Sequence, residues 1–177
     1  MSHELRSDKK LRYSQWDRRP GDALCLRLPQ SLSRLLPAGN LGFRIWAAFT
    51  EETEAYLLEL LKPDYINGLT LLGGDPFEAE NQRTLLPFLR RVKKTYPGKD
   101  IWAYTGYTWE QLTSGAHRVS IPETVDMLQQ IDTLVDGPFI LAKKNIRLRF
   151  RGSENQRIIN VRRSFETQQI ILWEWSK

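Results

Sequence analysis

Apolar and polar residues follow a clear helical period in the segment after Thr50. The sequence EETEAYLLELLK begins with acidic residues, and threonine is a residue type that caps helix N-termini. Pro63 follows directly and is typical of the chain just past a helix end. The pattern therefore predicts a helix over 51–62, with an apolar side formed by Tyr56, Leu57, Leu60 and Leu61.

A short apolar run and a second helical pattern come next. LTLL at 69–72 follows the turn pair Asn67-Gly68 and suits a strand that is buried on both faces. From about residue 78 to 96, apolar residues recur at helical spacing between cations. We expect Pro87 to bend this helix or to mark a late start. The expected inward residues are Leu85, Leu86, Leu89 and Val92, and the expected outward ones are Arg90, Arg91, Lys93 and Lys94.

Strands and helices continue to alternate as far as residue 137. DIWAYTGY at 100–107 predicts a strand, and TLVDG at 133–137 predicts another. Helices are predicted between them at about 109–112 and 122–130. This alternation predicts an α/β fold with a parallel sheet and crossover helices. The tail after Ile146 predicts irregular structure followed by one or two strands.

Glycine and polar residues stand where the predicted strands end. Gly73, Gly74, Asp75 and Pro76 follow LTLL, TGY follows IWAY, and DGPF follows TLV. Ligands of parallel sheets sit at the carboxyl ends of the strands. Paired glycines let backbone approach a ligand, and a carboxylate suits a ligand with an amino or ammonium group. The alternative is a tight strand-to-helix turn, for which this composition is common.

Polar residues in RGSENQ offer a second candidate site. Asn155 and Gln156 carry donors and acceptors and Arg151 a cation, on a segment too polar for a core. They either contact a ligand or partner, or they staple a loop. Asp136 either faces a site at its strand end or forms an Asx turn.

Composition narrows the class of protein. The net charge of +5 raises nucleic-acid binding as a possibility, but no nucleic-acid motif surrounds the arginines. The polar, basic start and the lack of a long apolar run predict a cytoplasmic protein without a membrane partner. Cys25 is the only cysteine, which excludes an internal disulfide and a cysteine-based metal site in the chain as written.

From about Phe49 onward the chain resembles the activating proteins of anaerobic ribonucleoside-triphosphate reductase, which are radical S-adenosylmethionine enzymes. The resemblance rests on FTEETEAYLLELLKPDYINGLTLLGGDPFEAENQ, PGKDIWAYTGYTWEQL, IDTLVDGPF and RFRGSENQRIINV. It implies a partial (βα) barrel that holds S-adenosylmethionine beside a [4Fe-4S] cluster. Reductive cleavage then gives a 5′-deoxyadenosyl radical, which takes a hydrogen atom from a glycine of the reductase.

The resemblance also implies site residues and partners. Gly73, Gly74 and Asp75 match the turn that binds the amino end of S-adenosylmethionine. Asn155 and Gln156 match a family pattern RGSSNQ, in which Glu154 here replaces the second serine. The implied partners are the large catalytic subunit of the reductase and a reduced flavodoxin-like electron donor.

One expected motif is missing. The family holds its cluster with C-x3-C-x2-C after the first strand, but here that region reads LRLPQSLSRLLPAGNLGFRIWAAFT, leucine-rich and broken by prolines and glycines. Without the thiolates we expect no metal ligands, no catalytic residue set and no radical chemistry in this chain. We also expect the first strand and cluster loop not to be native-like.

A shifted reading frame is our hypothesis for this departure. In the shifted frame, each codon consists of the last two bases of one codon and the first base of the next. A leucine codon that ends in TG, followed by a codon that starts with C or T, then reads as cysteine. This is allowed at the junctions Leu28-Pro29, Leu32-Ser33 and Leu35-Leu36, which have the C-x3-C-x2-C spacing. Leu41-Gly42 can read as tryptophan, and Trp46-Ala47 must read as glycine.

We therefore interpret residues from about 15 to 48 as out of frame, within an aberrant segment 1–49 that precedes an activase-like domain at 50–177. A diverged member that lost its cluster is the alternative origin. The alternative functions are a non-catalytic module that docks on the reductase and a basic nucleic-acid-binding protein.

Overall fold

The computed structural model describes the backbone of residues 24–28 and the whole of residues 49–174. Within these residues the sheet has five strands in the order β1-β2-β3-β4-β5: Leu24–Leu28, Gly68–Gly73, Asp100–Tyr104, Thr133–Asp136 and Arg157–Asn160. The first four strands are parallel, and β5 pairs antiparallel with β4. The predicted α/β class is confirmed, whereas the partial (βα) barrel stays a prediction.

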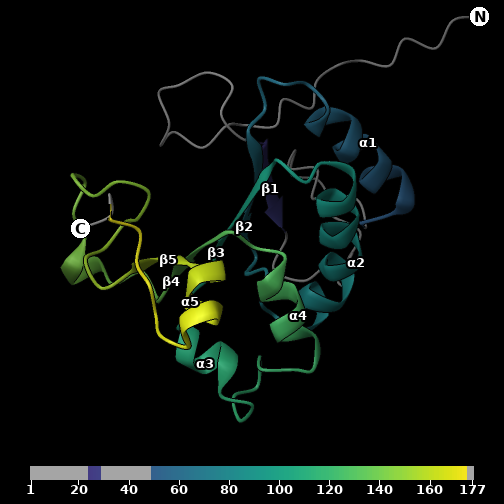
Figure 1. The fold of residues 1–177 in the computed structure, drawn as a ribbon. Coiled ribbons are helices and arrows are strands. Elements are labelled where there is room, and N and C mark those ends of the chain that lie inside the picture. Colours follow the sequence, from purple (N-terminus) through teal and green to yellow (C-terminus); the bar gives the residue numbers. More distant parts are fainter. Residues whose placement is uncertain (1–23, 29–48, 175–177) are drawn as a thin grey trace, which may run out of the picture.

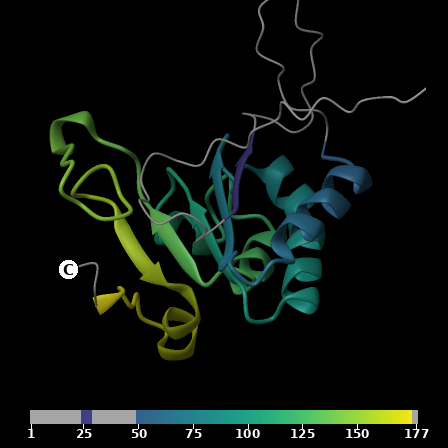
Figure 2. The ribbon, with the colours of Figure 1, turned by 90° about the horizontal axis from the view of Figure 1, so that it is seen from above.

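Helices connect the parallel strands. They are α1 at Glu51–Leu61, α2 at Ala79–Thr95, α3 at Trp109–Thr113 and α4 at Glu123–Gln129, and a final helix, α5, spans Val161–Thr167. Because consecutive parallel strands are neighbours and crossovers are right-handed, the crossover helices fall on one face of the sheet. Figures 1 and 2 show α1 and α2 side by side along that face.

The core lies between this helical layer and the sheet. The inward face predicted for α2 is confirmed, since Leu85, Leu86, Leu89 and Val92 are buried. Phe77 and Phe88 are the largest side chains that are fully buried. Among the described residues, none of the helices has the length and apolar character that a membrane span requires.

Two helix predictions need correction. Tyr56 was expected on the apolar side of α1 but is exposed, because the buried face runs through Leu57 and Leu61 with Glu54 beside them. The late start considered at Pro87 is wrong, since α2 begins at Ala79 and continues past the proline.

The prediction for the tail is confirmed in part. Irregular structure through RGSENQ is followed by one strand, β5, as predicted, but the helix α5 comes next in place of a second strand. Asn160 explains where this helix starts, because its side chain accepts a hydrogen bond from the backbone N–H of Arg163 at 3.0 Å.

The structure contains the first strand, β1. This corrects the expectation that the first strand of the opening segment would not be native-like. β1 pairs with β2 in register from Leu24 opposite Leu69 to Leu28 opposite Gly73. The edge of β2 needs backbone partners, and the residue before Pro29 is biased toward extended conformations. The remainder of the predicted out-of-frame region, including the junctions at residues 32 and 35, lies outside the described residues.

Candidate functional site at the carboxyl edge of the sheet

The GGDP turn leaves β2 at the carboxyl edge of the sheet. Gly73 has φ of 107°, in the region that favours glycine, and Asp75 has φ of 24°. The backbone N–H of Asp75 donates to the carbonyl of Gly73 at 2.7 Å. This tight turn redirects the chain from the strand into α2, as one of the two sequence interpretations predicts.

The carboxylate of Asp75 joins this turn to the end of β3. Its Oδ1 accepts from the backbone N–H of Phe77 at 3.0 Å and from the Thr105 hydroxyl at 2.9 Å, and its Oδ2 accepts from the backbone N–H of Gly106 at 2.8 Å. Burial raises the pKa of Asp75, although these hydrogen bonds oppose that effect. A ligand ammonium could therefore reach only the remaining lone pairs of a carboxylate that already stabilises the turn.

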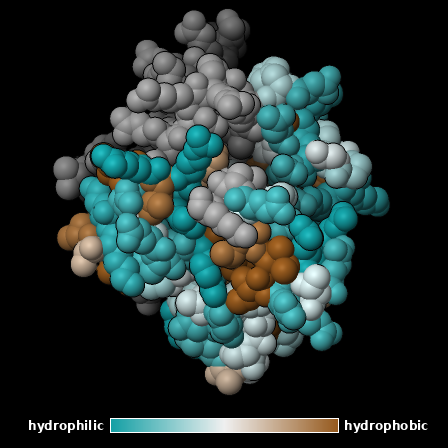
Figure 3. Space-filling view, turned by 60° about the vertical axis from the view of Figure 1, so that its left-hand side comes forward, coloured by the Kyte–Doolittle hydropathy of each residue, from teal (hydrophilic) through white to brown (hydrophobic). Residues whose placement is uncertain are grey.

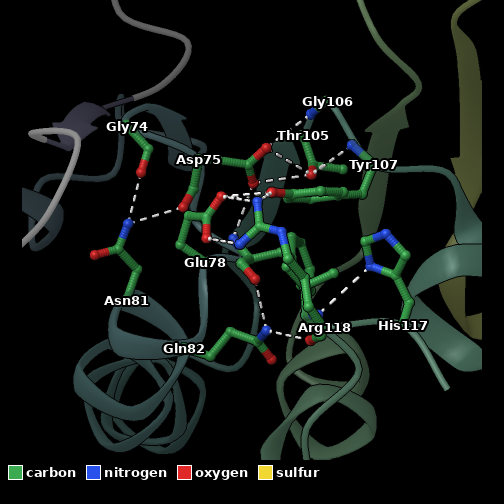
Figure 4. Close-up of polar contacts among 12 residues, drawn as sticks. Gly74, Asp75, Glu78, Asn81, Gln82, Thr105, Gly106, Tyr107, His117 and Arg118 are labelled. Carbon is green, nitrogen blue, oxygen red and sulfur yellow. Dashed lines mark hydrogen bonds and ion pairs between the residues drawn. The ribbon is translucent and has the colours of Figure 1, made fainter. Parts of the chain in front are cut away.

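Asn81 holds the same turn from α2 and was not predicted. It is fully buried, and its Nδ2 donates to the carbonyls of Gly74 and Asp75 at 2.6 and 2.8 Å (Figure 4). Its buried Oδ1 has no hydrogen-bond partner among the residues that the structure describes. An acceptor in this state costs free energy, so the turn contains a position suited to a hydrogen-bond donor.

A charged cluster borders the turn on its exposed side. Glu78 accepts two hydrogen bonds from Arg118, at 2.8 and 2.9 Å, and one from the Tyr107 hydroxyl. The hydrogen bonds from Arg118 lower the pKa of Glu78, and burial together with Glu78 raises the pKa of Tyr107 to about 12. His117 packs near the Tyr107 ring, with 5.5 Å between centroids (Figure 4). The cluster fixes the loop before α4 against the turn.

Asp136, at the end of β4, is held by a structural clamp. Its carboxylate accepts from Nε of Arg157 at 3.0 Å and from the backbone N–H of Trp109 at 2.7 Å. Arg157 also donates to both oxygens of Glu110, at 2.9 and 2.8 Å. The buried carboxylate thus joins β4, β5 and the start of α3, which is neither of the two roles considered from the sequence.

Asn155 and Gln156 staple two loops together, as one of the sequence interpretations predicts. Oε1 of Gln156 accepts from the backbone N–H groups of Gly152 and Ser153 at 2.9 and 3.1 Å, and its Nε2 donates to the carbonyl of Gly137 at 3.2 Å. Nδ2 of Asn155 donates to the carbonyl of Pro138 at 2.7 Å.

In the same segment, Arg151 forms a further hydrogen bond, whereas one buried acceptor has no partner among the described residues. Arg151 donates from Nη1 to the carbonyl of Gln156 at 3.2 Å. Oδ1 of Asn155 is buried and has no hydrogen-bond partner among the described residues. The segment therefore has a position for a donor as well as a structural role.

The candidate site therefore combines features that were predicted with features that were not. Gly73, Gly74 and Asp75 lie at the predicted strand end, and the buried amide oxygens of Asn81 and Asn155 both lie in segments that follow carboxyl ends of strands. Such oxygens suit N–H or O–H donors of a polar ligand. Within the described residues, no cluster of three or more histidine, cysteine, aspartate or glutamate side chains could hold a metal ion.

Comparison with known proteins gives consistent matches. Residues 40–159 match the model of a family described as a 4Fe-4S single cluster domain. A protein of Pasteurella multocida is 44% identical over 110 residues, which are 61% of this chain and 66% of that protein. A protein of Haemophilus influenzae is 41% identical over 117 residues, 65% of this chain and 70% of that protein.

A phage relative agrees with the bacterial ones. The protein of Enterobacteria phage T4 is 36% identical over 112 residues, which cover 62% of this chain and 64% of that protein. All three relatives are named anaerobic ribonucleoside-triphosphate reductase-activating protein. The chain thus spans about two thirds of the length of the curated relatives that it matches. No solved structure matches it.

Proposed function

Because this chain belongs to the radical S-adenosylmethionine family of reductase-activating proteins, we propose that its carboxyl-edge site evolved to bind S-adenosylmethionine and to activate anaerobic ribonucleoside-triphosphate reductase. In this proposal a glycyl radical on the large subunit of the reductase is the product. The observation that carries it is the GGDP turn together with the buried Oδ1 of Asn81, which has no hydrogen-bond partner within residues 49–174.

The described residues fit the amino acid part of S-adenosylmethionine. Gly73, Gly74 and Asp75 would hold its ammonium group, and Oδ1 of Asn81 supplies a buried acceptor at the same turn. Asn155 and Gln156 would line the neighbouring loop, where Oδ1 of Asn155 is a second acceptor. When bound, S-adenosylmethionine supplies a sulfonium whose carbon–sulfur bond is broken by reduction.

The residues present do not fit the iron–sulfur cluster. A [4Fe-4S] cluster of this family needs three thiolates at C-x3-C-x2-C spacing, and the chain has one cysteine, Cys25. No step of catalysis can therefore be assigned to a cluster on this chain. We propose that the chain as written binds no cluster, accepts no electron from a flavodoxin-like donor and generates no radical.

Out-of-frame translation of the cluster region is the proposed cause. One observation supports it: β1 ends at Leu28, where the first cysteine junction lies, so the junctions follow the first strand as the cluster loop does in the family that the chain resembles.

Paired biochemical assays test the proposed function. The chain as written and a chain with the frame restored over residues 15–48 are reconstituted anaerobically with iron and sulfide. We expect about four irons and 5′-deoxyadenosine from the restored chain only. We expect both chains to retain S-adenosylmethionine in equilibrium dialysis. If the chain as written binds four irons, the proposal that it binds no cluster is wrong. If the restored chain binds no S-adenosylmethionine, the proposed function of the site is wrong.

A non-catalytic docking module is the second candidate. It is favoured by the folded domain at 49–174, whose core and strand ends form without any contribution from cysteine. Binding to the large subunit without production of 5′-deoxyadenosine distinguishes this role from that of an active enzyme.

A further inference from the structure

The loop between β4 and β5 presents large apolar side chains to solvent. Phe139, Leu141 and Ile146 are 54%, 74% and 77% exposed, and Ile140 is also exposed. Figure 3, in which this side of the molecule is turned forward, shows hydrophobic surface gathered between hydrophilic areas. Exposed apolar residues that cluster within one polar segment mark interaction sites more often than scattered ones do.

The same loop is strongly basic. Lys143, Lys144, Arg147 and Arg149 are exposed, and none of them forms a salt bridge with another residue of the described part of the chain. Residues 139–149, here called the apolar-basic loop, thus combine exposed apolar side chains with exposed cations. This combination is complementary to a protein surface that places carboxylates around an apolar pocket.

The apolar-basic loop is held in a defined conformation at its base. The backbone N–H of Glu154 donates to the carbonyl of Lys143 at 3.0 Å, and that of Asn145 donates to Gly152 at 3.2 Å. The Asn145 side chain also donates to Glu154 at 3.0 Å. A loop ordered in advance loses less conformational entropy when a partner binds, which favours affinity.

The position of the loop connects it to the candidate site. It follows β4 and therefore leaves the sheet at its carboxyl edge, the edge at which the GGDP turn follows β2. We propose that the apolar-basic loop is the docking surface for the large subunit of the reductase, through an acidic, apolar surface of that subunit. This inference rests on the proposed function, because it takes the reductase as the protein that the site serves.

Binding of the full chain to the large subunit tests the inference without need of a cluster. Biolayer interferometry compares the chain as written with the double variant Leu141→Asp, Ile146→Asp. Carboxylates at these positions repel an acidic partner and remove two anchors, so we expect Kd to rise about tenfold or more. The variant Lys143→Glu, Lys144→Glu is expected to slow association and to reduce the dependence of the rate on salt.

Matched controls separate docking from general surface effects. Tyr65, 69% exposed before β2 and so at the opposite edge, is replaced by aspartate, and Lys94 on the outer side of α2 by glutamate. Both controls are expected to bind within about twofold of the parent chain. Circular dichroism melting verifies that every variant folds.

Each outcome decides a different point. A double variant that binds as tightly as the parent overturns the docking proposal alone, since the reductase is then bound elsewhere. A parent chain that does not bind the large subunit overturns the reductase as partner, and the docking proposal with it. Salt-dependent binding to single-stranded DNA, in place of the reductase and lost in the lysine variant, overturns both in favour of a nucleic-acid surface.

Discussion

At the scale of single residues, the hydroxyl of Thr105 is the main link between two strand ends. It donates to both oxygens of the Asp75 carboxylate, at 2.9 and 3.0 Å, and accepts from the backbone N–H of Tyr107 at 3.1 Å. Burial raises the pKa of Asp75, so each donor that contacts the ionised carboxylate offsets part of the cost of burying it. The shape of the GGDP turn depends on these contacts.

Replacement of Thr105 by valine tests this dependence. Thr105→Val keeps the shape of the side chain but leaves a buried carboxylate with one donor fewer, so we expect a loss of about 1–3 kcal/mol in the free energy of unfolding. Urea denaturation measures the loss. Thr105→Ser, which keeps the hydroxyl, and Thr113→Val, at an exposed position, serve as controls. A valine variant as stable as the serine variant would show that the hydroxyl does not hold the turn.

The sequence located the candidate site but not the contacts within it. Gly73, Gly74 and Asp75 were predictable because glycine and aspartate after an apolar run are characteristic of a strand end. Asn81 was not predictable, since a polar residue in the first turns of an amphipathic helix is normally solvated. Its role depends on the fold of a turn seven residues away, to which no local pattern points.

At the scale of secondary-structure elements, Arg157 fastens α3 to the sheet. Its guanidinium contacts Asp136 at the end of β4 and Glu110 in the first turn of α3. The hydrogen bonds from Arg157 lower the pKa of Glu110 to about 2, from an ordinary value of 4.5. α3 has only five residues, so contacts of this kind rather than helix propensity must stabilise it.

The lowered pKa of Glu110 predicts a pH dependence of stability. Ionised Glu110 stabilises the folded state above pH 4.5, and this contribution is lost as the pH falls toward about 2. Glu110→Gln should therefore be less stable than the parent near neutral pH and should approach it at low pH. Because the Glu110 side chain is 59% exposed, water screens the pair and the difference should be only about 1 kcal/mol.

Urea denaturation at about pH 6 and about pH 3 measures the difference, since these values lie on either side of the ordinary pKa of glutamate. Glu166→Gln, which affects only an exposed pair with Arg162, is the control. A difference between Glu110→Gln and the parent that does not change with pH would contradict the assigned ion pair.

Most elements followed from the pattern of the chain, and the exceptions have physical causes. α1, α2 and the strands β2 to β4 carry apolar residues at the periods of helices and strands. α5 was missed because VRRSFET is short and has no strong apolar period, so its start depends on the Asn160 cap. β1 was not expected because its pairing is determined by the open edge of β2.

At the scale of the whole molecule, the chain combines a folded domain of the reductase activase type with an opening segment that lacks the family's cluster ligands. The parallel sheet places the GGDP turn and the apolar-basic loop at one edge, where a cofactor and a protein partner could both be bound. We propose that a shifted reading frame accounts for the missing cysteines, with true divergence as the alternative origin; in either case the domain after residue 49 retains the family's sequence.

The nucleotide sequence across codons 15 to 49 distinguishes a shifted reading frame from true divergence. The shift requires that the codons of Leu28, Leu32 and Leu35 have TG at their second and third bases, and that a missing base restores the frame before Thr50. Recovery of a C-x3-C-x2-C motif in the shifted frame is the predicted result. A leucine codon at any of these three positions that does not end in TG would contradict the claim and leave true divergence as the origin of the segment.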